Sequence, residues 1–168
     1  MERFTHPVEP VYNSSSKVLI LGTFPSVKSR EGRFFYHHPQ NRFWKVIGAL
    51  CGDEMPHTIE EKKEMLLMNR IAVWDVIHSC EVTGSSDSSI RNVIVNDISV
   101  ILDTAEIGLI AANGAVAERL YNKYIYPQTG REIYKLPSTS PANATYTLEK
   151  LVLEWSYLLN FNNEDTKG

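Results

Sequence analysis

The sequence lacks several features that would assign it to a common class of protein. No apolar run approaches the roughly 20 residues that a membrane-spanning helix needs, and the first residues lack the apolar core of a secretory signal. The two cysteines, Cys51 and Cys80, show no metal-ligand spacing such as C-x-x-C, and both lie in apolar segments. We therefore expect a cytoplasmic protein with two buried free thiols.

Motifs of the common nucleotide-binding and hydrolytic folds are also missing. Gly22 follows an apolar run, but neither G-x-G-x-x-G nor the Walker pattern begins there, and no G-x-S-x-G elbow occurs. The five histidines show no ligand spacing, and the adjacent His37 and His38 would point apart on a regular helix or strand. We therefore expect no metal site and no dinucleotide-binding or Walker loop.

A net charge of −3 gives no overall sign of nucleic-acid binding, but the charges are unevenly distributed. Residues 28–45 hold five of the 17 basic residues and one of the 20 acidic residues. A locally positive loop on an acidic body suits phosphate contact at one place, although a solvated loop with chance clustering would look the same.

The length of 168 residues and the ordinary composition, 43% hydrophobic and 22% charged, indicate one globular domain. We treat residues 1–168 as a single domain, with an irregular lead-in over 1–16 and a polar tail over 160–168. Continuous apolar runs predict buried strands over 17–21, 70–77, 107–112 and 133–136. Apolar residues at helical spacing predict helices over 43–51, 59–69, 90–102, 116–124 and 148–159.

Local signals place some of the element boundaries. Thr58 and Glu61 match the S/T-x-x-E capping box at the start of the second helix, and Pro127 is expected to end the fourth. Strands and helices alternate, and no hairpin signal joins adjacent strands. The sequence therefore predicts an α/β fold, a three-layer sandwich with a central, mostly parallel four-stranded sheet flanked by helices.

In such folds the functional groups gather at the carboxyl ends of the strands. This places the loops after Leu21, Ile77, Ala112 and Leu136 on one rim. The loop from 22 to 44 is long, and a loop of about twenty residues inside a compact domain is usually functional or disordered. Its many aromatic rings argue against disorder, so we predict that the active site lies here.

The predicted rim is rich in amides, hydroxyls and aromatic rings and poor in acids. Asn41 cannot act as a general base at neutral pH, but an amide can orient a water or bind a planar heterocycle; it could also cap the following helix. Phe35 and Tyr36 could stack on a flat ligand, worth about 1–3 kcal/mol per base, or pin the loop to the core. For Asp75, support of the loop backbone is the favoured role.

Two stretches give this rim a more specific interpretation. Gly22-Thr-Phe-Pro-Ser26 and Phe35-Tyr-His-His-Pro-Gln-Asn-Arg-Phe-Trp44 resemble the first motif region of the uracil-DNA glycosylase superfamily, especially its mismatch-specific uracil glycosylase branch. Leu136-Pro-Ser-Thr-Ser-Pro-Ala-Asn143 resembles the second motif, a loop that enters the minor groove. Trp74-Asp-Val and Gly84-Ser-Ser-Asp-Ser-Ser-Ile90 further resemble the hypoxanthine-DNA (DNA-deoxyinosine) glycosylase family. The resemblance covers most of the chain in the right order.

The resemblance implies a uracil-DNA glycosylase-like fold and a DNA repair enzyme of base excision. Such an enzyme flips a deaminated base, hypoxanthine or uracil, out of DNA and hydrolyses its N-glycosidic bond. No lysine is an evident Schiff-base nucleophile, so we expect a monofunctional reaction without a lyase step, and such a reaction needs no metal or cofactor. The expected partner is DNA that contains deaminated bases, with no role for a membrane, and we expect a monomer.

The resemblance also assigns site residues. Most members carry Asp, Asn or another polar residue at the third position of the first motif, where this chain has Phe24, so the resemblance implies that Asn41 handles the attacking water. Tyr36 matches the ring that stacks on the extruded base, and Asn113 matches a base-reading side chain. Basic residues of the first loop and the Ser138/Ser140 loop would contact phosphates. The implied substrate-binding set is Gly22, Thr23, Phe24, Pro25, Ser26, Tyr36, Asn113, Ser138, Ser140 and Asn143.

Two other interpretations remain open at the level of sequence. Phe24 is compatible with a DNA-binding module that kept the pocket and lost catalysis. The acidic net charge is compatible with a nucleotide-binding protein or small-molecule enzyme on a doubly wound sheet. Release of a base from a damaged duplex would distinguish a DNA glycosylase from both of these alternatives.

Overall fold

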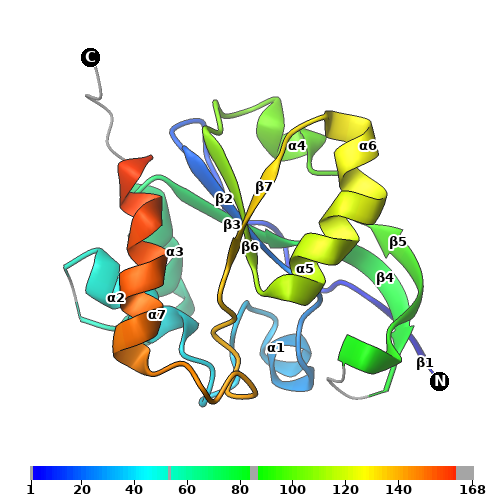
Figure 1. Cartoon of the computed structure of the whole chain (residues 1–168), viewed down its shortest axis with the longest axis horizontal. Coiled ribbons are helices and arrows are strands. Elements are labelled where there is room, and N and C mark those ends of the chain that lie inside the picture. The colour runs from blue at the N-terminus through cyan, green and yellow to red at the C-terminus, as the bar shows by residue number, and fades with distance from the viewer. Residues whose placement is uncertain (1, 53, 84–86, 162–168) are drawn as a thin grey trace.

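The computed structural model describes residues 2–52, 54–83 and 87–161 of the chain (Figure 1). Its centre is a four-stranded sheet with the strand order β3-β2-β6-β7. All three strand pairs are parallel, so the four carboxyl ends lie at one edge. The strands are β2 (Val18–Gly22), β3 (Ile71–Asp75), β6 (Leu109–Asn113) and β7 (Ile133–Leu136). The predicted α/β class and four-stranded parallel sheet are confirmed.

Both faces of this sheet are covered, which explains why β2 is apolar at every position before Gly22. Successive strand residues point to opposite faces. Val18 and Ile20 belong to the core on one face, whereas Leu19 and Leu21 belong to the core on the other. The first core includes side chains of α2 (Phe43–Leu50), α3 (Ile59–Met68) and α7 (Leu148–Trp155). The second includes side chains of α4 (Ser99–Leu102) and α5 (Ala115–Leu120), and α5 lies across the sheet from α7 (Figure 1).

A second, antiparallel sheet was not predicted. It has the strand order β1-β4-β5 and consists of β1 (Glu2–Thr5), β4 (Ile77–Val82) and β5 (Arg91–Val95). The expectation of an irregular lead-in is therefore wrong for residues 2–5. The single strand predicted over 70–77 is also wrong, because the chain leaves the first sheet at Asp75 and enters the second at Ile77. The apparent absence of a hairpin signal was misleading for β4 and β5.

The helix predicted over 90–102 is wrong for its first half. Ile90, Ile94 and Ile98 stand four residues apart, which imitates a helical face. In the structure Arg91–Val95 pairs with β4, and only Ser99–Leu102 is α-helical. Tertiary pairing with β4 therefore overrode the local spacing.

Other element boundaries differ in smaller ways. The long loop contains a short helix, α1 (Val27–Gly32), which begins where the Ser26 side chain accepts a hydrogen bond from Ser29 N. Pro127 does not end the preceding helix: α5 continues through a π-helical segment, Tyr121–Ile125, into α6 (Tyr126–Thr129). Pro127 lies in the first turn of α6, where its missing N–H is tolerated.

The remaining expectations hold in part or fall outside the described residues. The capping box of Thr58 and Glu61 is confirmed at the start of α3, and α7 is followed by a 3-10 turn, Ser156–Asn160. The predicted loop at 84–89 is described only for Asp87–Ser89, which form a 3-10 turn, and nearly all of the predicted tail lies outside the described residues. Among the described helices, none is both long and apolar enough to cross a bilayer.

Candidate active site

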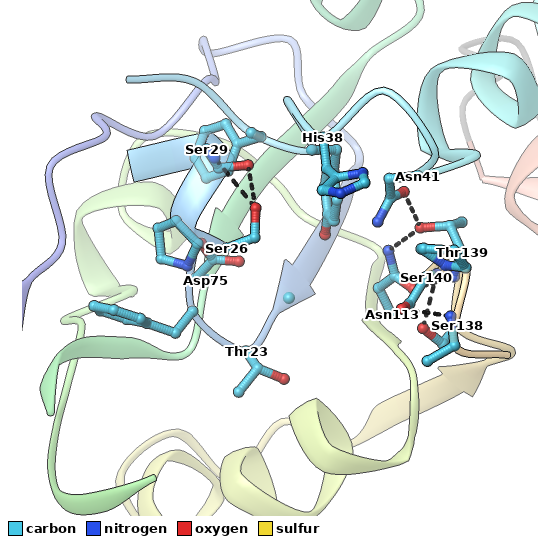
Figure 2. Close-up of a pocket in the computed structure, with 17 residues that line it drawn as sticks. Thr23, Ser26, Ser29, His38, Asn41, Asp75, Asn113, Ser138, Thr139 and Ser140 are labelled. Carbon is cyan, nitrogen blue, oxygen red and sulfur yellow. Dashed lines mark hydrogen bonds between the residues drawn. The ribbon is translucent and has the colours of Figure 1, made fainter. Parts of the chain in front are cut away.

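A cavity of about 420 Å³ opens at the carboxyl edge of the parallel sheet (Figure 2). Strand ends supply part of its lining, since Gly22, Asp75 and Asn113 are the last residues of β2, β3 and β6. The loop after β7 and the loop before α2 supply most of the rest. Every predicted site residue lines this cavity except Asn143, which lines an adjacent cavity instead. The lining also includes Ser29, Phe35, His38, Thr139, Pro141 and Ala142.

Thr139 joins the two predicted amide residues in one chain of hydrogen bonds (Figure 2). Its hydroxyl donates to Asn41 Oδ1 at 2.8 Å and accepts from Asn113 Nδ2 at 3.0 Å. Its backbone N–H donates to Asn113 Oδ1 at 3.0 Å. Asn113 and Thr139 are buried, and Asn41 is partly buried. The structure therefore brings together residues that lie 26 to 98 positions apart.

Asn41 also supports the start of α2, as the alternative interpretation of the sequence suggested. Its Oδ1 accepts a hydrogen bond from Phe43 N at 3.0 Å. Together with the bond from Thr139, this uses both lone pairs of the carbonyl oxygen. The amide nitrogen is thus the atom of Asn41 that remains to act on a ligand, and Figure 2 shows it directed away from Thr139.

Tyr36 lies at the cavity with one face of its ring covered. The ring stacks on Phe43 with centroids 4.0 Å apart and planes 17° apart. Its backbone adopts a left-handed conformation with φ of 52°, which is uncommon for an aromatic residue and fixes where the ring lies. Burial, and secondly the charge of Asp75, raise the pKa of the Tyr36 hydroxyl. The hydroxyl therefore stays protonated at physiological pH.

Gly22 is required at the floor of the cavity by close neighbours rather than by its backbone angles. A Cβ at this position would lie 2.4 Å from Asp75 Oδ1 and 2.7 Å from the Tyr36 hydroxyl. Both distances are shorter than a non-bonded carbon contact allows. The absence of a side chain at Gly22 therefore lets the carboxylate and the phenol approach the same point.

Asp75 is held by a residue from the N-terminal segment. His6 Nε2 lies 2.8 Å from Asp75 Oδ2, and both side chains are buried. His6 Nδ1 accepts a hydrogen bond from Val8 N at 3.1 Å, so Nδ1 carries no proton and Nε2 donates to the carboxylate. The His6 imidazole thus holds the carboxylate in place, whereas no hydrogen bond from a loop N–H group to the Asp75 side chain is seen among the described residues.

The serines of the second loop bond to their own backbone. Ser138 Oγ accepts from Ser140 N at 3.1 Å, and Ser140 Oγ accepts from Ala142 N at 3.1 Å. Asn143 Nδ2 donates to the carbonyl of Ser138 at 3.0 Å, which closes the turn. These bonds give the loop a fixed shape at the mouth of the cavity.

The basic residues between positions 28 and 45 fall into two groups. Lys28, Arg33 and Lys45 are exposed and can reach a phosphate. Arg30 instead stacks its guanidinium over Phe4 at 4.2 Å, and partial burial lowers its pKa. Arg42 donates to the carbonyls of Tyr146, Ser140 at 3.0 Å and Asn143 at 3.1 Å. It is therefore a clamp on the second loop.

Several residues of the site were missed at the level of sequence. Thr139 lies inside the Ser-Thr-Ser motif, but only its neighbours Ser138 and Ser140 were predicted as site residues. His38 was considered only as a metal ligand, yet it faces the cavity (Figure 2). Its Nδ1 accepts a hydrogen bond from Gln40 N at 3.1 Å. His6 lies in the lead-in, where no sequence signal marked it. Within the described part of the chain, no cluster of three or more His, Cys, Asp or Glu side chains could hold a metal ion.

Comparisons with known proteins find relatives of this chain. The family model described as the uracil DNA glycosylase superfamily matches residues 9–160. A hypoxanthine DNA glycosylase of Methanosarcina acetivorans is 33% identical over 139 residues, which cover 82% of this chain and 87% of the relative. One of Methanosarcina barkeri is 31% identical over 107 residues, covering 62% and 68%.

A solved structure gives the same result. The solution NMR structure of a protein from M. acetivorans, described as a candidate uracil DNA glycosylase, superposes with a TM-score of 0.75. The two chains are 30% identical, and the match covers 90% of this chain and 96% of the other. The resemblance seen in the two motif regions is therefore confirmed by sequence and by fold.

Proposed function

The chain belongs to the uracil DNA glycosylase superfamily, and we propose that it is a DNA repair glycosylase that removes deaminated bases, hypoxanthine foremost and uracil second. The proposal of hypoxanthine is supported by the two hypoxanthine DNA glycosylases, which match most of the chain or of their own length. A DNA N-glycosylase hydrolyses the bond between the base and the sugar.

The observation that carries the proposal is the convergence of both motif loops on one cavity. Its volume of about 420 Å³ is in the range of pockets that enclose small ligands. Tyr36, backed by Phe43, offers a flat surface for a base, and the linked amides of Asn41 and Asn113 offer polar contacts at its edge. A pocket of this kind suits a planar heterocycle better than a flexible substrate.

The proposed reaction begins with extrusion of the damaged base from the duplex. Extrusion costs a few kcal/mol and least for a poorly paired base, which favours hypoxanthine and uracil in mismatches. As the glycosidic bond breaks, the sugar becomes an oxocarbenium ion and the base leaves with negative charge. Water then bonds to the anomeric carbon of the sugar, and the proton that it loses neutralises the released base. Fixed hydrogen-bond donors in the cavity stabilise that charge, because they bind the transition state more strongly than the ground state.

We assign Asn41 as the catalytic residue. Because its carbonyl oxygen already accepts from Phe43 N and Thr139, it can act on a water or on the leaving base through Nδ2. Asn113, by its place at the end of β6, would contact the base edge. The exposed Lys28, Arg33 and Lys45 would bind DNA phosphates, which position the duplex without reading its sequence.

The proposal extends to the form in which the protein acts. We propose that it works as a single domain and a monomer, in the cytoplasm, without a metal or cofactor. Size-exclusion chromatography with light scattering tests the monomer, and full activity in EDTA tests independence from a metal. A dimer that dissociates with loss of activity would contradict the first point.

The experiment uses duplexes that contain a single deoxyinosine or deoxyuridine, in EDTA. We expect the wild-type protein to release the free base and leave an abasic site without strand cleavage. Asn41→Ala should reduce single-turnover base release about 100-fold, the loss typical of removing one transition-state donor. Asn122→Ala, an exposed asparagine on the π-helical segment, is the matched control and should have wild-type activity. Absence of base release from both duplexes would refute the proposal.

A further inference from the structure

We propose that Thr139 is a positioning residue that sets base specificity. It fixes the Asn41 amide with its NH₂ group toward the cavity, so that the site accepts a base with a carbonyl group and rejects a base with an amino group there. The inference rests on the proposed function, since it concerns how the same cavity chooses its base.

The direction of each hydrogen bond in the chain follows from two backbone donors. The N–H of Phe43 can only donate, so the Asn41 atom 3.0 Å away is its carbonyl oxygen. The N–H of Thr139 can only donate, so the Asn113 atom 3.0 Å away is also a carbonyl oxygen. The other amide atom of Asn113 is therefore the nitrogen, and it donates to Thr139 Oγ1. The single hydroxyl proton of Thr139 is thereby directed to Asn41 Oδ1.

The position of Thr139 itself is fixed from both sides. The side chain is fully buried, so solvent does not compete for its hydroxyl. The N–H of Arg42 donates to the Thr139 carbonyl at 3.1 Å, and the Arg42 guanidinium holds the carbonyls that follow in the same loop. Thr139 is therefore tied to the loop that carries Asn41 through backbone and side chain.

Rotation of the Asn41 amide by 180° would place its NH₂ group against two donors. One is the N–H of Phe43, and the other is the Thr139 hydroxyl, which already accepts from Asn113 and would have to turn its proton away from Asn41 before its second lone pair could accept. Loss of two hydrogen bonds, at about tenfold each, depletes the rotated amide about 100-fold. The Asn41 NH₂ group therefore faces the cavity as a hydrogen-bond donor. The amide does not readily rotate to accept a hydrogen bond from a base that also presents a donor.

This matters because adenine is abundant in DNA and hypoxanthine is its deaminated product. Adenine carries an amino group, a donor, at position 6, whereas a 6-oxo purine carries a carbonyl acceptor there. A fixed donor from Asn41 Nδ2 would bind the carbonyl and leave the amino group opposed by another donor. A site built around a specific hydrogen bond discriminates strongly against an analogue that cannot form it.

The test measures binding as well as base release. Duplexes with 2′-fluoroarabino deoxyinosine or deoxyadenosine resist hydrolysis, so the ratio of their affinities reports base preference directly. In Thr139→Val one of the two contacts that oppose rotation is lost, and we expect the preference for the 6-oxo base to fall about tenfold. Thr139→Ser keeps the hydroxyl and should restore it. Thr104→Val is the matched control, because Thr104 bonds Val100 O on the remote α4 segment.

Asn41→Asp is a second, isosteric test that does not alter the Thr139 loop. Its carboxylate still accepts from Phe43 N and Thr139 but presents an acceptor to the cavity, so the 6-oxo preference should fall more than tenfold. An unchanged affinity ratio in both Thr139→Val and Asn41→Asp would overturn the inference. Failure of the wild-type protein to release hypoxanthine would instead overturn the proposed function, because the affinity ratio is measured independently of cleavage.

Discussion

Replacement of Arg42 by alanine should destabilise the protein and slow base release, rather than weaken DNA binding alone. The guanidinium donates to three backbone carbonyls, those of Ser140, Asn143 and Tyr146. A hydrogen bond to a charged group is worth about 1.5–3 kcal/mol when its partner is buried. These residues are only partly buried, so water can replace part of the lost bonding, and the net cost should be about 2 kcal/mol.

Loss of the Arg42 contacts should affect both the melting temperature and the rate of base release. For a protein of this size, about 2 kcal/mol corresponds to a fall in Tm of roughly 4–8 °C. The loop also carries Thr139, so its loosening should lower the single-turnover rate of base release from a deoxyinosine duplex about tenfold. Arg42→Lys keeps the charge but not the planar fork that spans several carbonyls, and it should behave more like Arg42→Ala than like the wild type.

The same assays distinguish this role from the phosphate contact predicted from the sequence. Lys45→Ala, three residues away on an exposed position, should leave Tm unchanged, weaken DNA binding and reduce the slope of log K against log salt by about 0.9. If Arg42→Ala showed that pattern, with an unchanged Tm and an unchanged rate at saturating DNA, the structural role of Arg42 would be refuted.

Two further predictions concern the floor of the cavity. Gly22→Ala should abolish most base release and lower stability by about 1–3 kcal/mol, because its Cβ would displace Asp75 or Tyr36; Gly108→Ala, whose Cβ would meet atoms at 3.7 Å or more, is the control in the same melts. Burial, and secondly the charge of Asp75, raise the pKa of the Tyr36 hydroxyl in the folded state above its unfolded value of 10.0. Above that pH the unfolded chain loses the hydroxyl proton before the folded protein does, so the free energy of unfolding falls as the pH rises. Tyr36→Phe should flatten that alkaline loss in pH-dependent denaturation while retaining the ring and the base release, whereas Tyr36→Ala should lose base release more than affinity for undamaged DNA. An alkaline loss of stability that persists in Tyr36→Phe, or an active Tyr36→Ala, would contradict these assignments.

Some elements were predicted wrongly from the sequence because their structure depends on pairing with a segment that is distant in the chain. Residues 91–95 have isoleucines around them at a helical spacing, but β4 offers an open edge and they form a strand. β1 pairs with β4 across more than seventy positions of sequence, and no local pattern in a short polar segment marks such a partner. Pro127 was expected to end a helix, but it falls in the first turn of α6, where proline is tolerated.

The sequence alone is enough to predict the parallel sheet and the composition of its rim. Apolar runs buried on both faces leave few alternatives to a parallel sheet, and parallel strands place their carboxyl ends together. That reasoning, with the motif resemblance, named ten of the residues that line the cavity, but it missed Thr139 and His38. The contacts that these residues make with one another become visible only in the folded chain. Hydrogen-bond direction, the carbonyls held by Arg42 and the support of Asp75 by His6 depend on contacts of about 3 Å between distant segments. Such contacts leave no periodicity in a sequence, because each is a single pair fixed by packing.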